Sequence, residues 1–204
     1  MNMVITVSRE FGSGGRELAK RLADALVLSY VDKEIVTMIS KESGVSEDYV
    51  KSILDGGVKK SFAITFSRSS SYMATSMAPQ ILAQHHKTVR EIAERGNCVI
   101  VGSYGEAALR NVPHFRMFVY ADNEHKVNRC IDHAREGESL NPKEMERKIL
   151  QIDKARAKDH EFISDRRWGE KSGYDLCINT TGREIKELVP VVAEYIKVWY
   201  GSGK

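Results

Sequence analysis

The sequence predicts an α/β fold built on a parallel β-sheet, and three observations support this prediction. Short apolar runs, rich in β-branched or aromatic residues, have the length and composition of buried strands. Stretches with apolar residues at helical spacing separate these runs, and such alternation produces right-handed crossovers between parallel strands. A glycine-rich turn closely follows the first run. The predicted strands are Met3–Val7, Cys98–Gly102, Phe115–Tyr120 and Tyr174–Asn179.

A strand, a turn and a helix follow one another at the start of the chain. Met3–Val7 is the strand and Gly12–Gly15 is the turn. The helix is predicted because apolar residues then recur at spacings of three and four. These residues are Leu18, Ala19, Leu22, Ala23 and Leu26. The unit places the amino end of a helix directly beside the glycine turn.

Two later helices carry start signals. Asn141 is a candidate N-cap with Pro142 at the first helical position, and the helix is expected to extend to about Ile163. Thr181–Glu184 has the pattern of a capping box and precedes a last helix. Pro190 lies within this last pattern, so we expect it to kink the helix or to delay its start.

Length and composition limit the classes of partner. At 204 residues the chain is expected to form one domain, 1–204. The net charge is only +3 and basic residues are sparsely interleaved with aromatic ones, so we expect no nucleic-acid partner. No membrane partner is expected either, since no run approaches the roughly 20 apolar residues of a membrane span. Three cysteines without a CxxC pair and the lack of a signal peptide favour a cytoplasmic location with reduced thiols. The sequence leaves the oligomeric state open.

The glycine turn is a candidate phosphate site, because a helix amino end presents unpaired N–H groups and positive potential. The dinucleotide pattern G-x-G-x-x-G fails at Glu17. The P-loop pattern G-x-x-x-x-G-K-[ST] fits at Gly14 but has Arg9, Gly15 and Arg16 in place of its first glycine, its lysine and its hydroxyl residue. A turn that merely reverses the chain remains an alternative. The two flanking arginines favour phosphate, since each can supply the contacts of the missing lysine.

The stretch Ser8–Glu17, SREFGSGGRE, resembles the opening signature of the cytidylate-kinase-like family, a branch of the P-loop nucleoside monophosphate kinases. Further stretches that agree are Tyr30–Glu34, Cys98–Gly102, Trp168–Gly169 and Tyr174–Thr180. The resemblance implies a P-loop three-layer sandwich with a five-stranded parallel sheet, helices on both faces and a helical lid. It also implies an acceptor region after the second strand and an arginine-bearing lid at about 137–170. The weak periodicity of Asp55–Met77 favours a mobile insert or a poorly packed connection between helices, and the acceptor-side insert is placed at about 46–80.

The lid region contains charged residues on one helical face. Asp153, Arg156 and His160 are spaced i, i+3 and i+7, and Arg166 and Arg167 follow them. In the resembling kinases this region closes over the phosphates and excludes water. A solvated helix with weak surface ion pairs is the alternative.

Three positions bear on the bound nucleotides. By resemblance Asp32 and Lys33 border the acceptor, although Asp32 also fits as the N-cap of a helix that starts at Glu34. Arg129 is assigned by resemblance to the donor base. The family pattern has an arginine directly after the Val-Ile-Val-Gly strand end, where this chain has Ser103. The change removes a bidentate contact to an acceptor phosphate.

The implied function is transfer of the γ-phosphoryl group of ATP, with Mg²⁺, to a small acceptor, first of all a pyrimidine nucleoside monophosphate. A nucleotide-binding module with weak or no catalysis is the alternative. The sequence does not identify a magnesium ligand beyond Asp32 as a candidate. The expected catalytic residues are Arg16, Arg156, Arg166 and Arg167. The expected nucleotide ligands are Arg9, Gly12, Ser13, Gly14, Gly15, Arg16 and Arg129, and the expected substrate ligands are Asp32, Lys33, Ser103 and Asp153.

Overall fold

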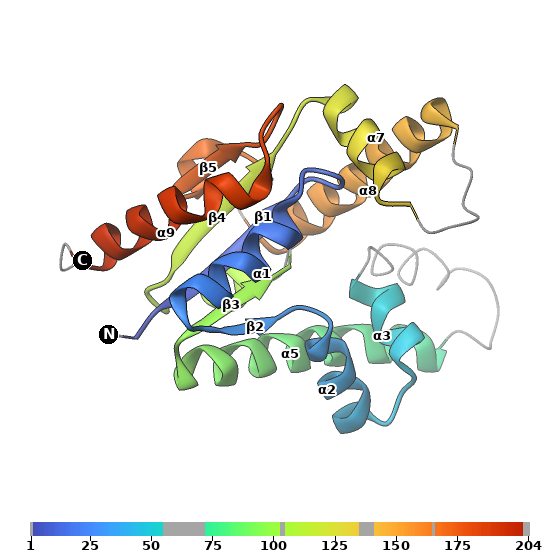
Figure 1. Cartoon of the computed structure of the whole chain (residues 1–204). Coiled ribbons are helices and arrows are strands. Elements are labelled where there is room, and N and C mark those ends of the chain that lie inside the picture. The colour runs from blue at the N-terminus through green and yellow to red at the C-terminus, as the bar shows by residue number, and fades with distance from the viewer. Residues whose placement is uncertain (1, 55–71, 103–104, 135–140, 165, 202–204) are drawn as a thin grey trace.

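The computed structural model describes residues 2–54, 72–102, 105–134, 141–164 and 166–201. Five strands form one parallel sheet in the order β2-β3-β1-β4-β5 (Figure 1). The predicted five-stranded parallel sheet is therefore confirmed. The strands are β1 Val4–Arg9, β2 Ser29–Val31, β3 Cys98–Val101, β4 Phe115–Tyr120 and β5 Leu176–Asn179.

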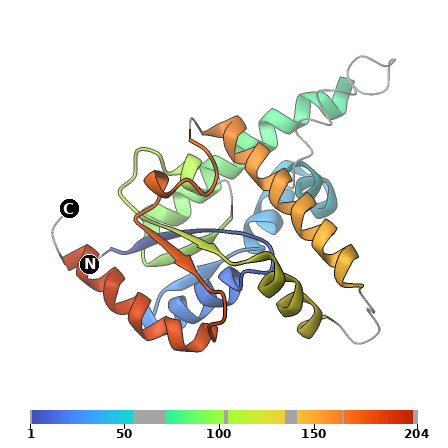
Figure 2. The same ribbon diagram turned by 90° about the horizontal axis from the view of Figure 1, so that it is seen from above.

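Helices cover both faces of the sheet, as Figure 2 shows. Helices α1 and α9 pack on one face with the apolar side chains of β1, β3 and β4, while α5 and α2 pack on the other. None of the described helices is long and apolar enough to cross a membrane. The helices are α1 Gly15–Leu26, α2 Glu34–Ser43, α3 Glu47–Ser52, α5 Tyr72–Arg95, α6 Gly105–Ala108, α7 Asn123–Asp132, α8 Pro142–Ile163 and α9 Ile185–Gly201, with a 3₁₀ turn at Lys171–Gly173.

The central strand β1 is longer than the apolar run that predicted it. It extends to Arg9, whose backbone pairs with Val119 of β4. Ile5 and Val7 point into the core beneath α1 and α9, and Arg9 follows on the same face because side chains alternate along a strand. The sheet therefore fixes the backbone of Arg9, which the sequence pattern had placed beyond the strand, flanking the turn.

Of the two predicted helix caps, the structure confirms the first. The side chain of Asn141 accepts a hydrogen bond from the N–H of Lys143 at 3.0 Å, and Pro142 is the first residue of α8. The predicted capping box at Thr181–Glu184 is wrong: α9 begins only at Ile185, and Gly182 has a φ of +65°, which a helix does not accept. The Thr181 hydroxyl instead accepts the N–H of Asp122 at 2.9 Å. The expectation that Pro190 delays this helix is wrong, because α9 is already formed before the proline and continues past it. Of the predicted insert at about 46–80, residues 55–71 lie outside the described residues, and the described parts contain α3 and the beginning of α5.

An ion pair joins the amino ends of β4 and β5. The guanidinium of Arg116 donates to both carboxylate oxygens of Asp175 at 3.0 and 3.1 Å, and the backbone N–H of Arg116 donates to the same carboxylate at 2.9 Å. Burial alone would raise the pKa of Asp175, but these hydrogen bonds outweigh it and hold the pKa below its ordinary 3.8.

Asp175→Asn is expected to lower the free energy of unfolding at pH 7 by about 1.5–3 kcal/mol, the usual contribution of a charged hydrogen bond. Because the folded pKa is lowered, the wild-type advantage is present above pH 3.8 and is lost as the pH falls through the folded pKa. Urea titrations at several pH values measure the difference. The matched control is Asp48→Asn, since the Asp48 side chain is 96% exposed. A difference that does not shrink below pH 3.8 would show that the carboxylate charge is not the cause.

Candidate functional site

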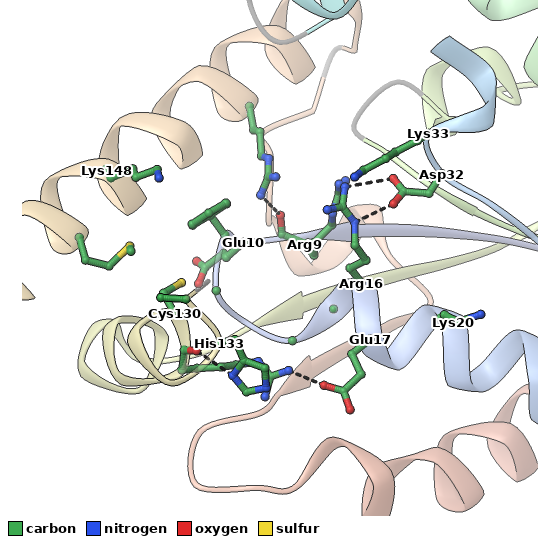
Figure 3. Close-up of a pocket in the computed structure, with 18 of the residues that line it drawn as sticks. Arg9, Glu10, Arg16, Glu17, Lys20, Asp32, Lys33, Cys130, His133 and Lys148 are labelled. Atoms are coloured by element: carbon green, nitrogen blue, oxygen red, sulfur yellow. Dashed lines mark hydrogen bonds and ion pairs between the residues drawn. The ribbon is translucent and has the colours of Figure 1, made fainter. Parts of the chain in front are cut away.

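A cavity of about 730 Å³ opens at the carboxyl edge of the sheet, beside the glycine turn (Figure 3). Its size is that of a small-molecule site, which typically spans about 300–1,000 Å³. It lies where ligands of open α/β sheets collect. Residues from the turn, the end of β2, α7 and α8 line it: Arg9, Glu10, Phe11, Gly12, Gly14, Gly15, Arg16, Glu17, Lys20, Tyr30, Asp32, Lys33, Arg129, Cys130, His133, Ala134, Met145, Lys148 and Arg156.

The turn needs glycine for conformation and for space. Gly12 and Gly14 have φ values of +82° and +77°, which L side chains rarely adopt. Gly14 is the N-cap of α1 and has no side-chain cap, so the first N–H groups of the helix face the cavity edge without a protein side chain on them. Ser13 is fully buried, and both its hydroxyl and its N–H donate to the Glu10 carbonyl. The hydroxyl and the N–H of Ser13, which were expected to bind phosphate, therefore form the hydrogen bonds that close the turn.

The side chain of Arg9 occupies the space that a side chain at position 15 would need. A Cβ atom at Gly15 would lie 2.6 Å from the Cβ of Arg9 and 3.1 Å from the Cβ of Val119. Real Cβ atoms do not approach so closely, and both neighbours are anchored in strands. The P-loop pattern has a small residue at position 9 and a long cation at position 15. This chain has the reverse, and the two departures are sterically linked.

The guanidinium of Arg9 forms no hydrogen bond or ion pair with any other residue that the structure describes. Burial, together with the positive charges of Arg156 and Arg16, lowers the pKa of Arg9 to about 9. Asp32 opposes this shift without contacting the group. A partly buried cation surrounded by other cations is costly unless an anion accompanies it. The electrostatics around Arg9 therefore favour a bound anion in the cavity.

Arg16 and Asp32 form a bidentate ion pair at the mouth of the cavity. The Nε of Arg16 lies 2.7 Å from one carboxylate oxygen and an Nη lies 3.2 Å from the other. The Tyr30 hydroxyl also donates to Asp32, at 3.3 Å. The alternative that Asp32 caps α2 is wrong: the N-cap is Lys33, and the Asp32 N–H instead donates to the Glu34 carboxylate at 2.9 Å. Figure 3 shows Arg9, Arg16, Asp32 and Lys33 gathered beside the first turn of α1.

Two side chains of helix α8 form hydrogen bonds with the backbone just before the glycine turn. A carboxylate oxygen of Asp153 accepts the N–H of Phe11 at 2.7 Å, and Arg156 donates to the Arg9 carbonyl at 3.1 Å. The guanidinium of Arg156 also lies over the Phe11 ring, 5.8 Å from its centre. Burial raises the pKa of Asp153 above its ordinary value, although the Phe11 hydrogen bond and Lys126 oppose the shift. Asp153 thus positions the turn, and Arg156 combines a contact to the turn with a place in the cavity wall.

A buried lysine extends this connection to α7. The ammonium of Lys126 lies 2.9 Å from Glu10 and 3.4 Å from Asp153, and only 6% of its side chain is exposed. Thr180, after β5, donates to the Ser13 carbonyl at 2.8 Å. The sequence reasoning assigned no role to Glu10 or Thr180, and it associated Lys126 with Arg129 at the donor base rather than with the turn. The one available signal was that Glu10 and Thr180 both lie in the stretches that resemble the kinase family.

The remaining predicted residues fall into three groups. Lys33 and Arg129 line the cavity, and Arg129 pairs with Glu17 on the first turn of α1. Arg166 and Arg167 are exposed and are not among the lining residues; the Arg166 Cδ lies where it would contact a side chain at Gly173. Ser103 lies outside the described residues. The catalytic roles of Arg166 and Arg167 stay predictions.

Comparison with known proteins decides the family. The model of the cytidylate kinase-like family matches residues 4–182, which include the turn, the sheet and α8. The chain belongs to the cytidylate kinase-like family. Family and fold together indicate a kinase-type, nucleotide-binding protein. A comparison with curated proteins finds no match.

Solved structures similar to this cytidylate kinase-like chain cover nearly all of it. An uncharacterized protein from Eubacterium ventriosum has a TM-score of 0.70 at 23% identity, over 96% of this chain and 98% of that one. A shikimate kinase from Bacteroides thetaiotaomicron has a TM-score of 0.55 at 15% identity, over 97% and 99%. A shikimate kinase from Acinetobacter baumannii, in complex with shikimate, has 0.51 at 14%, over 97% and 94%. At these identities the likeness shows the fold alone.

Proposed function

We propose that this cytidylate kinase-like chain transfers the γ-phosphoryl group of ATP to a small acceptor, first of all a pyrimidine nucleoside monophosphate. The observation that carries the proposal is the Arg9 guanidinium, which lies in the cavity wall beside a helix amino end without a partner among the described residues. Phosphate is the ligand that satisfies both the cation and the unpaired N–H groups. Family membership supports the pyrimidine acceptor.

We assign the following roles in the proposed transfer to residues of the chain. The N–H groups of Gly14, Gly15 and Arg16 would bind the donor phosphates, and Arg9 would neutralise them from the strand side. Arg156 would stabilise the charge that develops during transfer, since phosphoryl transfer depends chiefly on positioning and positive charge. Asp32 and Lys33 would border the acceptor, with Asp32 held in place by its ion pair.

Magnesium accompanies ATP in P-loop kinases, where a Ser or Thr hydroxyl after the lysine binds it. Here Arg16 occupies that position and pairs with Asp32, the one carboxylate that the sequence offered as a metal ligand. The side chains at this place do not fit a divalent cation. No step of the proposed transfer is therefore assigned to the metal.

We also propose that residues about 137–170 act as a lid over the phosphates and that about 46–80 contribute to the acceptor side. The part of α8 at Asp153 and Arg156 is bonded to the turn, so closure would involve the residues after it. Arg166 and Arg167 would reach the phosphates only through such a movement, which would also exclude water.

A combined binding and turnover screen tests the proposal. Calorimetry with ATP is expected to show binding, and a coupled assay is expected to show ADP formation that depends on CMP or UMP. Transfer to CMP is expected to be poor in the wild type and to improve in Ser103→Arg, through a lower KM or a higher kcat at unchanged ATP affinity. Shikimate is included because two structural neighbours are shikimate kinases.

The outcomes separate the alternatives. ATP-dependent phosphorylation of shikimate alone would keep the phosphotransferase and replace the acceptor. ATP binding without transfer to any acceptor would favour a nucleotide-binding module. No binding of any nucleoside triphosphate would reject the proposal.

A further inference from the structure

The charge distribution of the cavity bears on the form of nucleotide that it binds. Its lining contains seven arginine or lysine residues but three carboxylates. The cations are Arg9, Arg16, Lys20, Lys33, Arg129, Lys148 and Arg156, and the carboxylates are Glu10, Glu17 and Asp32. A metal-free triphosphate carries more negative charge than a metal-bound one. The excess of cations over carboxylates in the lining therefore bears on which of the two forms the cavity binds.

Each of the three carboxylates is already paired with a cation. Asp32 binds Arg16 in bidentate geometry at 2.7 and 3.2 Å. Glu17 pairs with Arg21 at 2.8 Å and also with Arg129.

The third carboxylate, Glu10, is 2.9 Å from the buried ammonium of Lys126. It also accepts the Ala121 N–H at 3.3 Å. A divalent cation would need carboxylate oxygens that are not already paired with arginine or lysine. Every carboxylate of the lining would first have to give up its present partner.

Several of the cations, in contrast, have no carboxylate partner in the described part of the chain. Arg9, Lys33 and Lys148 form no ion pair there, and Lys20 instead lies over the Tyr30 ring, 5.6 Å from its centre. Glu34, which is not in the lining, offsets Lys20 and Lys33 in part, because the charges of both contribute to lowering its pKa. The lining itself still contains more cations than carboxylates. A ligand with many negative charges and no bound metal complements this wall best.

We propose that the site binds the metal-free nucleoside triphosphate, and that the Arg16 guanidinium, held by Asp32, takes the place of the magnesium ion. Arg16 stands at the position where the P-loop pattern has its metal-binding hydroxyl. A planar guanidinium that already shares one edge with Asp32 can still donate from its other edge to a phosphate oxygen. Magnesium on the triphosphate would cancel part of the ligand's charge and add positive charge to a cavity already rich in it. The inference rests on the proposed nucleotide function and concerns binding, not turnover.

Calorimetric titration of the whole chain with ATP, once in EDTA and once in excess MgCl₂, tests the inference. We expect ATP in EDTA to bind at least as tightly as in MgCl₂. Any tightening by Mg²⁺ in the wild type, beyond the error of the measurement, would overturn the inference and leave the proposed function intact. Failure of ATP to bind in both buffers would overturn the proposed function and the inference with it.

The variant Arg16→Ser, which restores the hydroxyl residue of the generic P-loop pattern, provides a second test. In EDTA we expect this variant to bind ATP more weakly by roughly tenfold to a hundredfold, the usual effect of a lost charged hydrogen bond. In MgCl₂ we expect part of the loss to be recovered, because a hydroxyl can now ligate the metal. ATP affinity in EDTA equal to that of the wild type would show that Arg16 does not replace the ion.

The matched control is Arg95→Ser. Arg95 is an exposed arginine that ends α5 just before β3, at the opposite edge of the parallel sheet. We expect no change in ATP affinity in either buffer. Melting temperatures of both variants check folding, and the wild-type comparison decides the inference even if Arg16→Ser does not fold.

Discussion

Gly15→Lys is expected to abolish ATP binding and to destabilise the chain, although it restores the lysine of the generic P-loop. A side chain at position 15 would overlap the Cβ of Arg9 and press on Val119, and these two residues are paired with each other in the sheet, so relief requires a shift of the strands or of the turn. Overpacking of this kind costs about 1–3 kcal/mol, which corresponds to a fall in Tm of about 2–12 °C for a chain of this length. The turn whose N–H groups are proposed to bind phosphate would be displaced as well.

A double-variant cycle separates the steric effect from the change of charge. Arg9→Gly with Gly15→Lys rebuilds the generic arrangement and is expected to recover stability, with ATP binding restored relative to Gly15→Lys alone. The coupling between the two positions should reach about 0.5–3 kcal/mol, as for residues in direct contact. Calorimetry and thermal melts measure both quantities. Additive effects of the two changes would show that positions 9 and 15 do not share one space.

Arg9→Met is expected to weaken ATP binding by about tenfold to a hundredfold while leaving the Tm unchanged or raising it. In the proposed site the guanidinium supplies a phosphate contact, so its loss would remove a charged hydrogen bond of about 1.5–3 kcal/mol. It makes no ion pair within the described chain, and burial and neighbouring cations disfavour its charge, so the fold does not depend on it. Methionine keeps the apolar stem and its packing beside Gly15.

The control for this variant is Arg95→Met, which removes an exposed arginine far from the turn. ATP affinity and Tm of the control should both match the wild type. A fall in Tm at unchanged ATP affinity in Arg9→Met would make Arg9 a structural residue. It would also remove the observation on which the proposed function depends.

Much of the sheet could be predicted from local pattern, because β1, β3 and β4 are largely buried on both faces. The apolar run Phe115–Tyr120 is β4 with the predicted bounds. Strand β2 is different: it has three residues, of which Ser29 is exposed, so periodicity could not reveal it and the family resemblance was needed. The end of β1 at Arg9 was also missed, because a charged residue does not extend an apolar pattern although sheet pairing accepts it.

The candidate site could be predicted in its residue types but not in its pairings. Arg9, Arg16 and Asp32 were all candidates from the sequence. Whether Asp32 caps a helix or binds Arg16 depends on which partner is closer in space, and capping rules describe only the local choice. Relative to the P-loop pattern, this chain has the long residue at position 9 and the small residue at position 15. That reversal depends on the distance between the two Cβ positions across the turn. Spacing along the chain carries no information about that distance.

The hydrogen bonds between Asp153 and Phe11 and between Arg156 and Arg9 also determine when the glycine turn can be fixed during synthesis of the chain. The glycine turn is made near the beginning of the chain, yet the side chains that hold its entrance come 142 and 147 residues later. A growing chain that ends before α8 has the glycines and both arginines without the groups that fix their backbone. A nucleotide that binds at this turn as proposed would therefore stabilise the protein only after most of it has left the ribosome, and it would then favour the finished fold over every shorter intermediate.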